Sequence, residues 1–238
     1  MARKRTRLQS SSGQTRKPER LRLRPGSKSA AGSIRRAVEV LEAGLLVAIP
    51  TDTFYGIAAD PRSDAAVRRL LKAKGRGGPP PLVADGLQQV GQVAVLGCLA
   101  AQLASRFWPG PLTLVLPARS GRLSKRAIHR GTVAVRVPKH PIVRRLAKAF
   151  GSPLTATSAN RTGQAPARSA SEVEKGLGGD VSLILDGGRS SARLPSTIVA
   201  VRRNVVEILR DGCIPAARIR RFLTEVGGAP GGPASRSC

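Results

Sequence analysis

The sequence contains few aromatic residues and few cysteines, and it has no long apolar run. Aromatic residues make up only 3% of the 238 residues, so a hydrophobic core must be built from Ala, Val, Leu and Ile. The three cysteines, Cys98, Cys213 and Cys238, are odd in number and lack CxxC spacing. This pattern argues against a disulfide framework or a zinc site and favours a reducing compartment such as the cytoplasm. No apolar run approaches the ~18 residues of a membrane span.

Acidic residues are also scarce, because 14 Asp and Glu stand against 41 Lys and Arg, for a formal charge of +27. Residues 1–30 hold ten cations and one acid, Glu19, which gives +9 and leaves +18 for the rest. A chain this basic attracts polyanions such as tRNA, ATP or a membrane surface in a salt-dependent way. Such attraction is generic and does not by itself predict a specific nucleic-acid site.

The two ends of the chain lack a hydrophobic period. Residues 1–30 are rich in Ser and Arg, and we predict a disordered basic arm. An organellar transit peptide has a similar composition, but Leu8, Leu21 and Leu23 are too few for its amphipathic helix, so a solvated arm is favoured. The Gly/Pro/Ser-rich residues 223–238 are predicted to be a disordered tail.

Between these ends, predicted strands and helices alternate over residues 31–222, without internal repeats. This alternation predicts one α/β domain with a mixed sheet and flanking helices. Ser33 and Ser63 are predicted helix N-caps, and Ser169 with Glu172 forms a capping-box pattern. A further helix is predicted from Pro141 through Phe150. Strands are predicted near residues 45–49, 82–84, 112–116, 132–137, 153–156, 181–185, 198–201 and 205–209.

Three loops carry side chains suited to ligands. Lys72, Lys74 and Arg76 lie where a predicted helix ends, before a Gly/Pro run. Cations on a rigid turn can bind phosphate or carboxylate, although such a run is more often a solvated helix end. Residues 50–56 (PTDTFYG) and 157–163 (TSANRTG) supply hydroxyls and amides after predicted strands, where open α/β sheets bind ligands. Turn chemistry alone would also explain the 50–56 pattern.

Arg136 is the exception in an apolar predicted strand, Thr132 to Val137. A guanidinium in a buried strand is rarely tolerated without an anionic partner, which is either a protein carboxylate or a ligand. Because acids are scarce in this chain, an anionic ligand is favoured as the partner of Arg136.

Seven segments, in order and at consistent spacing over about residues 33–215, resemble the YrdC-like family, the threonylcarbamoyl-AMP synthases. The segments are Pro50–Gly56, Lys74–Arg76, Phe107–Leu116, Val135–Pro138, Ser158–Asn160, Ser196–Val199 and Leu209–Gly212. The resemblance implies a single domain with a twisted, mostly open α/β sheet and a basic concave face. It implies a nucleotidyltransferase that makes threonylcarbamoyl-adenylate and pyrophosphate from L-threonine, bicarbonate and ATP. A separate transferase complex would then modify tRNA.

The resemblance also implies roles for particular residues. Lys74 and Arg76 would be the catalytic cations, on phosphate or carbamate oxygens. Thr53, Arg136 and Ser196 would bind threonine, with Arg136 on its carboxylate. The ATP side would consist of Arg76, Thr132, Ser158, Asn160 and Arg210. Mg²⁺ would come with ATP, held mainly by phosphate oxygens and water, and no protein metal site is expected.

This sequence departs from the family pattern at Pro80, in place of Asn, and at Asp85, in place of His. Arg193 is a candidate for an additional phosphate contact. These changes and the basic charge are also compatible with a second function, a non-catalytic module that binds tRNA or double-stranded RNA. If the protein is the enzyme, the same charge is compatible with direct tRNA contact. A third alternative is carbamoyl transfer of the hydrogenase-maturation type, which normally comes with zinc-finger and acylphosphatase-like domains.

Overall fold

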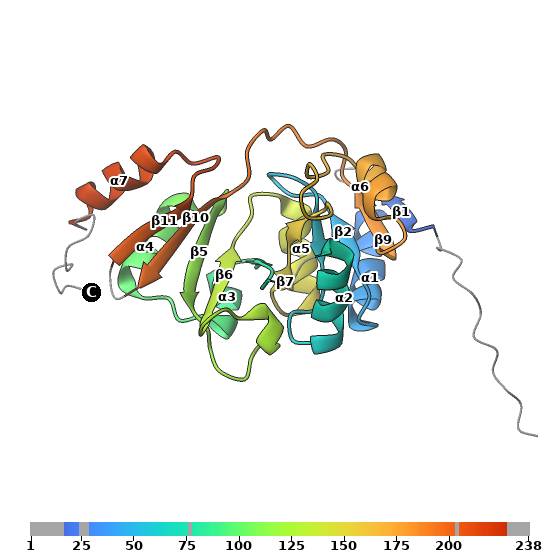
Figure 1. Ribbon diagram of the computed structural model, residues 1–238, viewed down its shortest axis with the longest axis horizontal. Coiled ribbons are helices and arrows are strands. Elements are labelled where there is room, and N and C mark those ends of the chain that lie inside the picture. The colour runs from blue at the N-terminus through green and yellow to red at the C-terminus, as the bar shows by residue number, and fades with distance from the viewer. Residues whose placement is uncertain (1–16, 24–28, 76–77, 203–204, 228–238) are drawn as a thin grey trace, which may run out of the picture.

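The computed structural model describes residues 17–23, 29–75, 78–202 and 205–227. The strands form two sheets rather than the single sheet predicted (Figure 1). Sheet A contains, in spatial order, β1 (Glu19–Arg22), β9 (Leu183–Asp186), β2 (Val47–Ile49), β3 (Gly56–Ala58) and β8 (Thr157–Ser158). Its first three strands are parallel, and β3 and β8 pair in antiparallel fashion.

Sheet B lies beside sheet A and is also mixed. Its order is β11 (Val205–Arg210), β10 (Thr197–Arg202), β5 (Leu112–Pro117), β6 (Thr132–Arg136), β4 (Leu82–Val83) and β7 (Leu154–Thr155). The pairs β10–β5 and β6–β4 are parallel, and the other three are antiparallel. The mixed α/β architecture with flanking helices that the sequence predicted is confirmed.

Helices cover both faces of sheet A. Helices α1 (Ser29–Glu42) and α5 (Pro141–Phe150) bury apolar side chains against one face. The other face packs against α2 (Asp64–Lys74) and α6 (Ala170–Leu177). Alternation on β2 explains the division, because Val47 and Ile49 face α1 while Ala48 faces α2.

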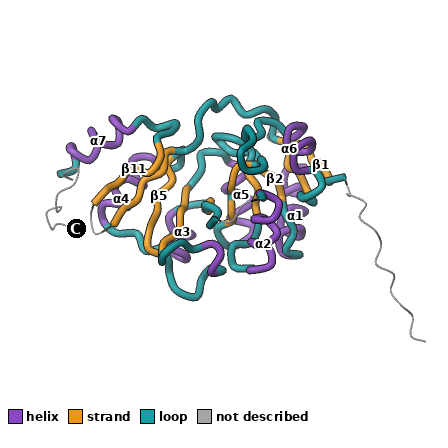
Figure 2. Tube along the Cα trace, viewed as in Figure 1, coloured by secondary structure: helices purple, strands orange, loops and turns teal. Residues whose placement is uncertain are grey.

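Sheet B is covered on one face only. Helices α3 (Leu87–Val93), α4 (Cys98–Phe107) and α7 (Ala216–Glu225) pack against alternate residues such as Leu114, Val135 and Val199. The tube in Figure 2 shows α4 and α7 at the end of the molecule where β11 and β5 lie. The opposite face of sheet B is therefore left for the polar loops.

The structure corrects both predicted ends of the domain. The arm predicted over residues 1–30 is wrong at β1, which pairs with β9 and is held there by an ion pair of Arg20 with Asp186 at 2.8 Å. A strand of four residues has too little hydrophobic period to be recognised in sequence. At the other end, α7 continues to Glu225 and buries Leu223, so the tail predicted from residue 223 begins too early.

One further expectation needs correction. Helix α1 begins at Ser29, so Ser33 lies inside the helix and is not its N-cap. Cys213 has a free thiol. The capping predictions at Ser63 and Ser169 are confirmed, since each hydroxyl accepts a backbone N–H of the following helix. Among the described residues, no helix is long and apolar enough to cross a membrane.

Candidate active site

The open face of sheet B and the edge of sheet A line one cleft. On β5, Thr113 and Val115 face the cleft while the residues between them face the core, and β6 presents Ala134 and Arg136 in the same way. The cleft has a volume of about 720 Å³ and adjoins a hollow of about 380 Å³. Both are lined by Pro79, Pro81, Thr157, Ser158 and Arg210, so they form one continuous site.

Lys74 links two of the loops that the sequence singled out. Helix α2 ends at Gly75, whose φ of 70° is the left-handed conformation of a helix C-cap. The Lys74 ammonium donates to Ser158 O at 2.7 Å, to Asn160 O at 2.6 Å and to Asn160 Oδ1 at 2.9 Å. This cation therefore holds the 157–163 loop against the end of α2, beside the smaller hollow.

Arg136 is 6% exposed at the end of β6. Its Nη2 lies 3.5 Å from Asp52 Oδ1, and its Nη1 donates to Thr53 Oγ1 at 3.4 Å. Burial lowers the pKa of Arg136, and the nearby charge of Asp52 partly opposes this shift. Because an arginine guanidinium remains charged in proteins, the cleft contains a buried cation that makes two long polar contacts with described residues.

An irregularity in the β10–β11 pairing directs two neighbouring residues into the cleft. Ile198 pairs with Arg210 and Val199 with Ile208, which leaves Leu209 as the extra residue of a β-bulge. In regular pairing, neighbouring residues would face opposite sides of the sheet. The bulge allows both Leu209 and Arg210 to line the cleft.

Arg210 and Ser196 form a second polar group in the cleft. Arg210 donates to Ser196 O through Nη2 at 2.8 Å and Nε at 3.1 Å. The hydroxyl of Ser196 shares a hydrogen bond with Thr113 Oγ1 at 2.9 Å. Burial lowers the pKa of Arg210, and the charge of Arg136 lowers it further. The two guanidinium groups repel each other, and an anion between them would relieve this repulsion.

The structure brings together seven of the nine residues predicted for the site: Lys74, Thr53, Arg136, Ser196, Ser158, Asn160 and Arg210 line the cleft or its adjoining hollow. Thr132 does not line either one; it lies at the start of β6, and its hydroxyl donates to His129 O at 2.7 Å. Arg76 lies outside the described residues. The individual roles of all nine remain predictions.

Some residues at the cleft were not assigned a role from the sequence. Thr113 faces the cleft because of its alternating position in LTLVL, a signal present in the sequence. Pro79 and Pro81 form part of the wall, where proline offers no backbone N–H.

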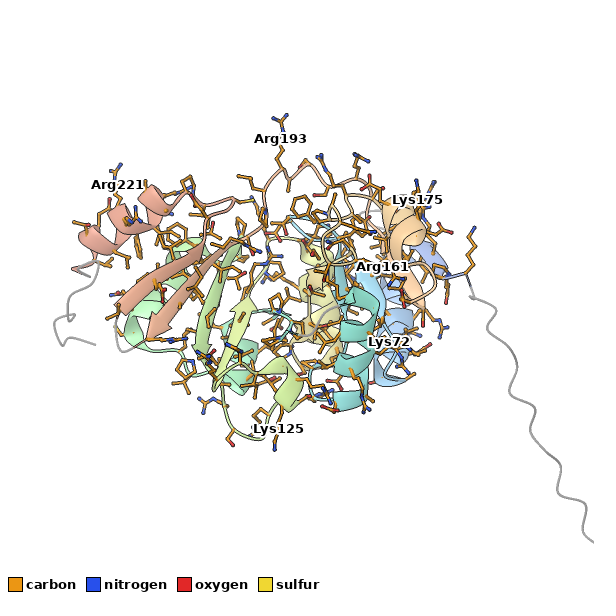
Figure 3. All side chains as sticks on the ribbon, viewed as in Figure 1. Lys72, Lys125, Arg161, Lys175, Arg193 and Arg221 are labelled. Carbon is orange, nitrogen blue, oxygen red and sulfur yellow. The ribbon has the colours of Figure 1, made fainter. Side chains whose placement is uncertain are left out.

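Arg193, the candidate for an additional phosphate contact, borders the cleft from the 187–196 connection. Figure 3 shows its side chain pointing outward from the molecule.

The charged residues at the cleft and hollow are all cationic in the described part of the chain: Lys74, Arg136 and Arg210, with Arg193 at the border. Within the same described residues, no group of three or more His, Cys, Asp or Glu side chains could hold a metal ion. The arrangement suits ligands that carry several negative charges and hydrogen-bond acceptors.

A cleft floored by an open sheet and lined by cations and hydroxyls defines an α/β protein that binds anionic ligands. Residues 39–212 match the Sua5/YciO/YrdC family model, which carries the description "Telomere recombination". The chain belongs to this family, as the motifs indicated.

Several relatives carry the name threonylcarbamoyl-AMP synthase, among them proteins from Vibrio vulnificus and Pyrococcus abyssi. The protein from Vibrio vulnificus is 36% identical over 76% of this chain and 98% of its own length. The one from Pyrococcus abyssi is 37% identical over 81% of this chain, which spans only 58% of that longer relative. The structure of P. abyssi Sua5 complexed with L-threonine has a TM-score of 0.76 and 34% identity, covering 87% of this chain and 61% of that one.

Proposed function

We propose that this chain is a threonylcarbamoyl-AMP synthase that acts in tRNA modification. The observation that carries the proposal is the single cleft, in which Arg136, Arg210 and Lys74 converge with hydroxyls from four other segments. The names of its relatives support the same activity. The substrates would be L-threonine, bicarbonate and ATP, and the enzyme would be a nucleotidyltransferase.

The reaction balances in two steps. The ammonium of threonine and bicarbonate give the carbamate, water and a proton. A carbamate oxygen then attacks the α-phosphorus of ATP, and pyrophosphate leaves. The reactants are anions that repel each other, so positioning and charge stabilisation are the main contributions required of the protein.

The threonine side of the site would lie around Arg136. Its guanidinium can hold the threonine carboxylate, while Thr53 and Ser196 supply hydroxyls nearby. Thr113 supports this arrangement because it fixes the Ser196 hydroxyl. A buried cation binds a carboxylate more strongly than an exposed one, since less water competes.

The ATP side would lie around Lys74, Ser158, Asn160 and Arg210, in the hollow that adjoins the cleft. Lys74 already has backbone and amide acceptors, so it would bind a phosphate oxygen by exchanging one of them. Mg²⁺ would supply charge neutralisation between phosphate oxygens when it arrives with ATP. The roles of Arg76 and of the bicarbonate site remain predictions, as do the downstream transferase complex, direct tRNA contact and the cytoplasmic location.

The proposal is tested by pyrophosphate release from ATP in the presence of bicarbonate. We expect release only when L-threonine is added, and we expect Arg136→Gln to lower it about 10²-fold or more because the threonine carboxylate loses its buried cation. Arg145→Gln is the matched control, since Arg145 is exposed on α5 outside the cleft. Release without threonine, or equal activity of both variants, would contradict the proposal.

The excess positive charge supports one other function, an RNA-binding module of the same fold without catalysis. That alternative predicts tight tRNA binding with a steep salt dependence and no detectable ATP binding. Binding of ATP, measured by calorimetry on the same preparation, would separate the two functions.

A further inference from the structure

Asp52 is the one carboxylate that pairs with a cation of the cleft among the described residues. It follows β2 at the carboxyl end of a parallel strand, and its Oδ1 lies 3.5 Å from Arg136 Nη2. Its Oδ2 accepts the backbone N–H of Lys139 at 3.3 Å. The Oδ1 atom is buried without a hydrogen-bond partner, which is an unusual condition for a carboxylate oxygen.

The position of Asp52 is costly if Arg136 serves only to bind anions. A carboxylate beside a guanidinium reduces the attraction of that guanidinium for any second anion. The other cations of the cleft, Arg210 and Lys74, lie beside hydroxyls and carbonyls rather than acids, so their attraction for anions is not reduced in this way. Arg136 therefore has a carboxylate beside it, whereas the cations on the phosphate side of the site do not.

A positive and a negative group side by side match a zwitterion. Asp52 lines neither the cleft nor the hollow, but it lies between Thr51 and Thr53, which both line the cleft. Rotation of its side chain toward the cleft would let the α-carboxylate of an amino acid bind Arg136 while the α-ammonium donates to Asp52 Oδ1, which accepts no hydrogen bond in the structure. Phosphate and pyrophosphate carry no such cation, and the charge of Asp52 repels them.

We propose that Asp52 is the acceptor for the α-ammonium of the amino-acid substrate and that it keeps phosphate groups off Arg136. This inference rests on the proposed synthase function. The pair of Arg136 and Asp52 thereby distinguishes the two substrates that must enter one cleft, a zwitterionic amino acid and a polyanionic triphosphate. Asp52 also holds the amino group in place until the ammonium releases its proton and the nitrogen attacks the carbon of bicarbonate.

A competing explanation is that Asp52 only orients Arg136. The two are distinguished by an analogue of L-threonine, (2S,3R)-2,3-dihydroxybutanoate, in which a hydroxyl replaces the α-ammonium. If Asp52 binds the ammonium, Asp52→Asn weakens threonine but not the analogue. If Asp52 only orients Arg136, the substitution weakens both alike, because both use the same carboxylate.

The experiment measures pyrophosphate release by the full chain, with the analogue and inorganic phosphate as inhibitors. For Asp52→Asn we expect the KM for threonine to rise roughly tenfold to a hundredfold, because the loss of a hydrogen bond to a charged group weakens binding by about this factor. The inhibition constant of the analogue should stay within about twofold, and inorganic phosphate should begin to compete with threonine. Glu42→Gln is the control for net charge, since Glu42 is exposed at the end of α1 and forms no ion pair in the described part of the chain.

An equal rise for threonine and the analogue, or an unchanged KM, would overturn the inference. The wild-type protein provides a test that does not depend on the folding of a variant. It must bind threonine at least about tenfold more tightly than the analogue, and phosphate must not compete with threonine. Wild-type protein that releases no pyrophosphate in response to threonine would instead refute the proposed function, so the two failures are distinguishable.

Discussion

Lys74 has two roles at the level of the single residue, because its ammonium both faces the phosphate side of the site and joins two loops. Lys74→Ala should lower kcat/KM for ATP by about 10²-fold or more, since a charge near the transferring phosphate is lost. It should also lower the free energy of unfolding by about 1–3 kcal/mol, because partly buried acceptors on Ser158 and Asn160 lose their donor. Pyrophosphate kinetics and urea unfolding measure the two effects.

Lys72→Ala is the matched control for this prediction. Lys72 lies two residues earlier on α2 and is exposed, in agreement with the solvated helix end that the sequence indicated. It should leave both quantities nearly unchanged. A stable and fully active Lys74→Ala variant would remove Lys74 from the site.

Tyr55 is the only tyrosine, so its ionisation can be followed without ambiguity. Its hydroxyl donates to Gly188 O at 2.7 Å and accepts from Gly187 N at 3.2 Å. Burial, reinforced by the charge of Asp186, raises the pKa of Tyr55 from 10.0 to about 12. The folded protein thus retains a proton that the unfolded chain loses above pH 10, and stability falls as pH rises from 10 through about 12.

We expect the free energy of unfolding of the wild type to decline more steeply over this pH interval than that of Tyr55→Phe. Urea unfolding at several pH values measures the difference, and ultraviolet absorbance of the phenolate follows the titration directly. Parallel pH profiles for the two proteins, or phenolate absorbance that appears near pH 10 in the folded protein, would contradict this assignment.

The candidate site shows what a sequence can and cannot predict about single residues. Arg136 could be singled out, because a charged residue in an apolar strand requires an anionic partner. Its contact with Asp52 could not, because the two residues are 84 positions apart and meet only when sheets A and B lie side by side. The shortage of acids favoured a ligand over a protein carboxylate, whereas the structure provides an acid at long distance and leaves space for a ligand.

At the level of the element, the end of α2 determines where Lys74 lies. Gly75 has a φ of 70°, which is costly for any residue with a Cβ. Gly75→Ala should therefore lower the free energy of unfolding by about 1–2 kcal/mol, and it should raise the KM for ATP because the helix end moves. Urea unfolding and pyrophosphate kinetics measure both.

Gly91→Ala serves as the control, because Gly91 lies inside α3 without a positive φ and a Cβ there would meet no atom within 4 Å. Alanine in a helix interior is favoured over glycine by roughly 0.5–1 kcal/mol, so this variant should be as stable as the wild type or more stable. Equal effects of the two substitutions would mean that the conformation of Gly75 does not matter.

The accuracy of sequence prediction depended on the length of each element. Helix α5 was predicted with its observed bounds, since its apolar residues recur over ten positions after Pro141. Strands β3 and β8 were missed, because two or three residues carry no measurable period. The division into two sheets depends on pairings between distant strands, such as β1 with β9, which no local pattern specifies.

At the level of the whole molecule, cations exceed acids by 27 formal charges, so most cations have no acid that could neutralise them. Within the described residues, ten acidic side chains form ion pairs with nearby cations, and each such pair adds little to the outer field. The paired acids are Glu19, Glu39, Asp52, Asp60, Asp64, Glu172, Glu174, Asp180, Asp186 and Glu225. Figure 3 labels cations on well-separated parts of the molecule, including Lys125, Lys175 and Arg221.

This surplus leads to a prediction about RNA that is independent of the reaction. The full chain should bind tRNA with a log–log salt slope of about −0.9 per phosphate contact, so four contacts would lower the affinity roughly tenfold for each doubling of salt. The outer face of α5 is a strong candidate for the contact surface. It carries Arg145 and Lys148, which are exposed and form no ion pair among the described residues, and the helix contains no acid.

The Arg145→Gln/Lys148→Gln variant tests this surface by fluorescence anisotropy of labelled tRNA at several salt concentrations. If α5 contacts the phosphate backbone, the magnitude of the slope should fall by about 2, one unit for each cation removed. Threonine-dependent pyrophosphate release should be unchanged, because neither residue lines the cleft. An unchanged slope would place the RNA on another face, and a slope near zero in the wild type would show that the excess charge does not bind RNA at all. The two measurements together separate the charge that serves the reaction, inside the cleft, from the charge that serves association, outside it.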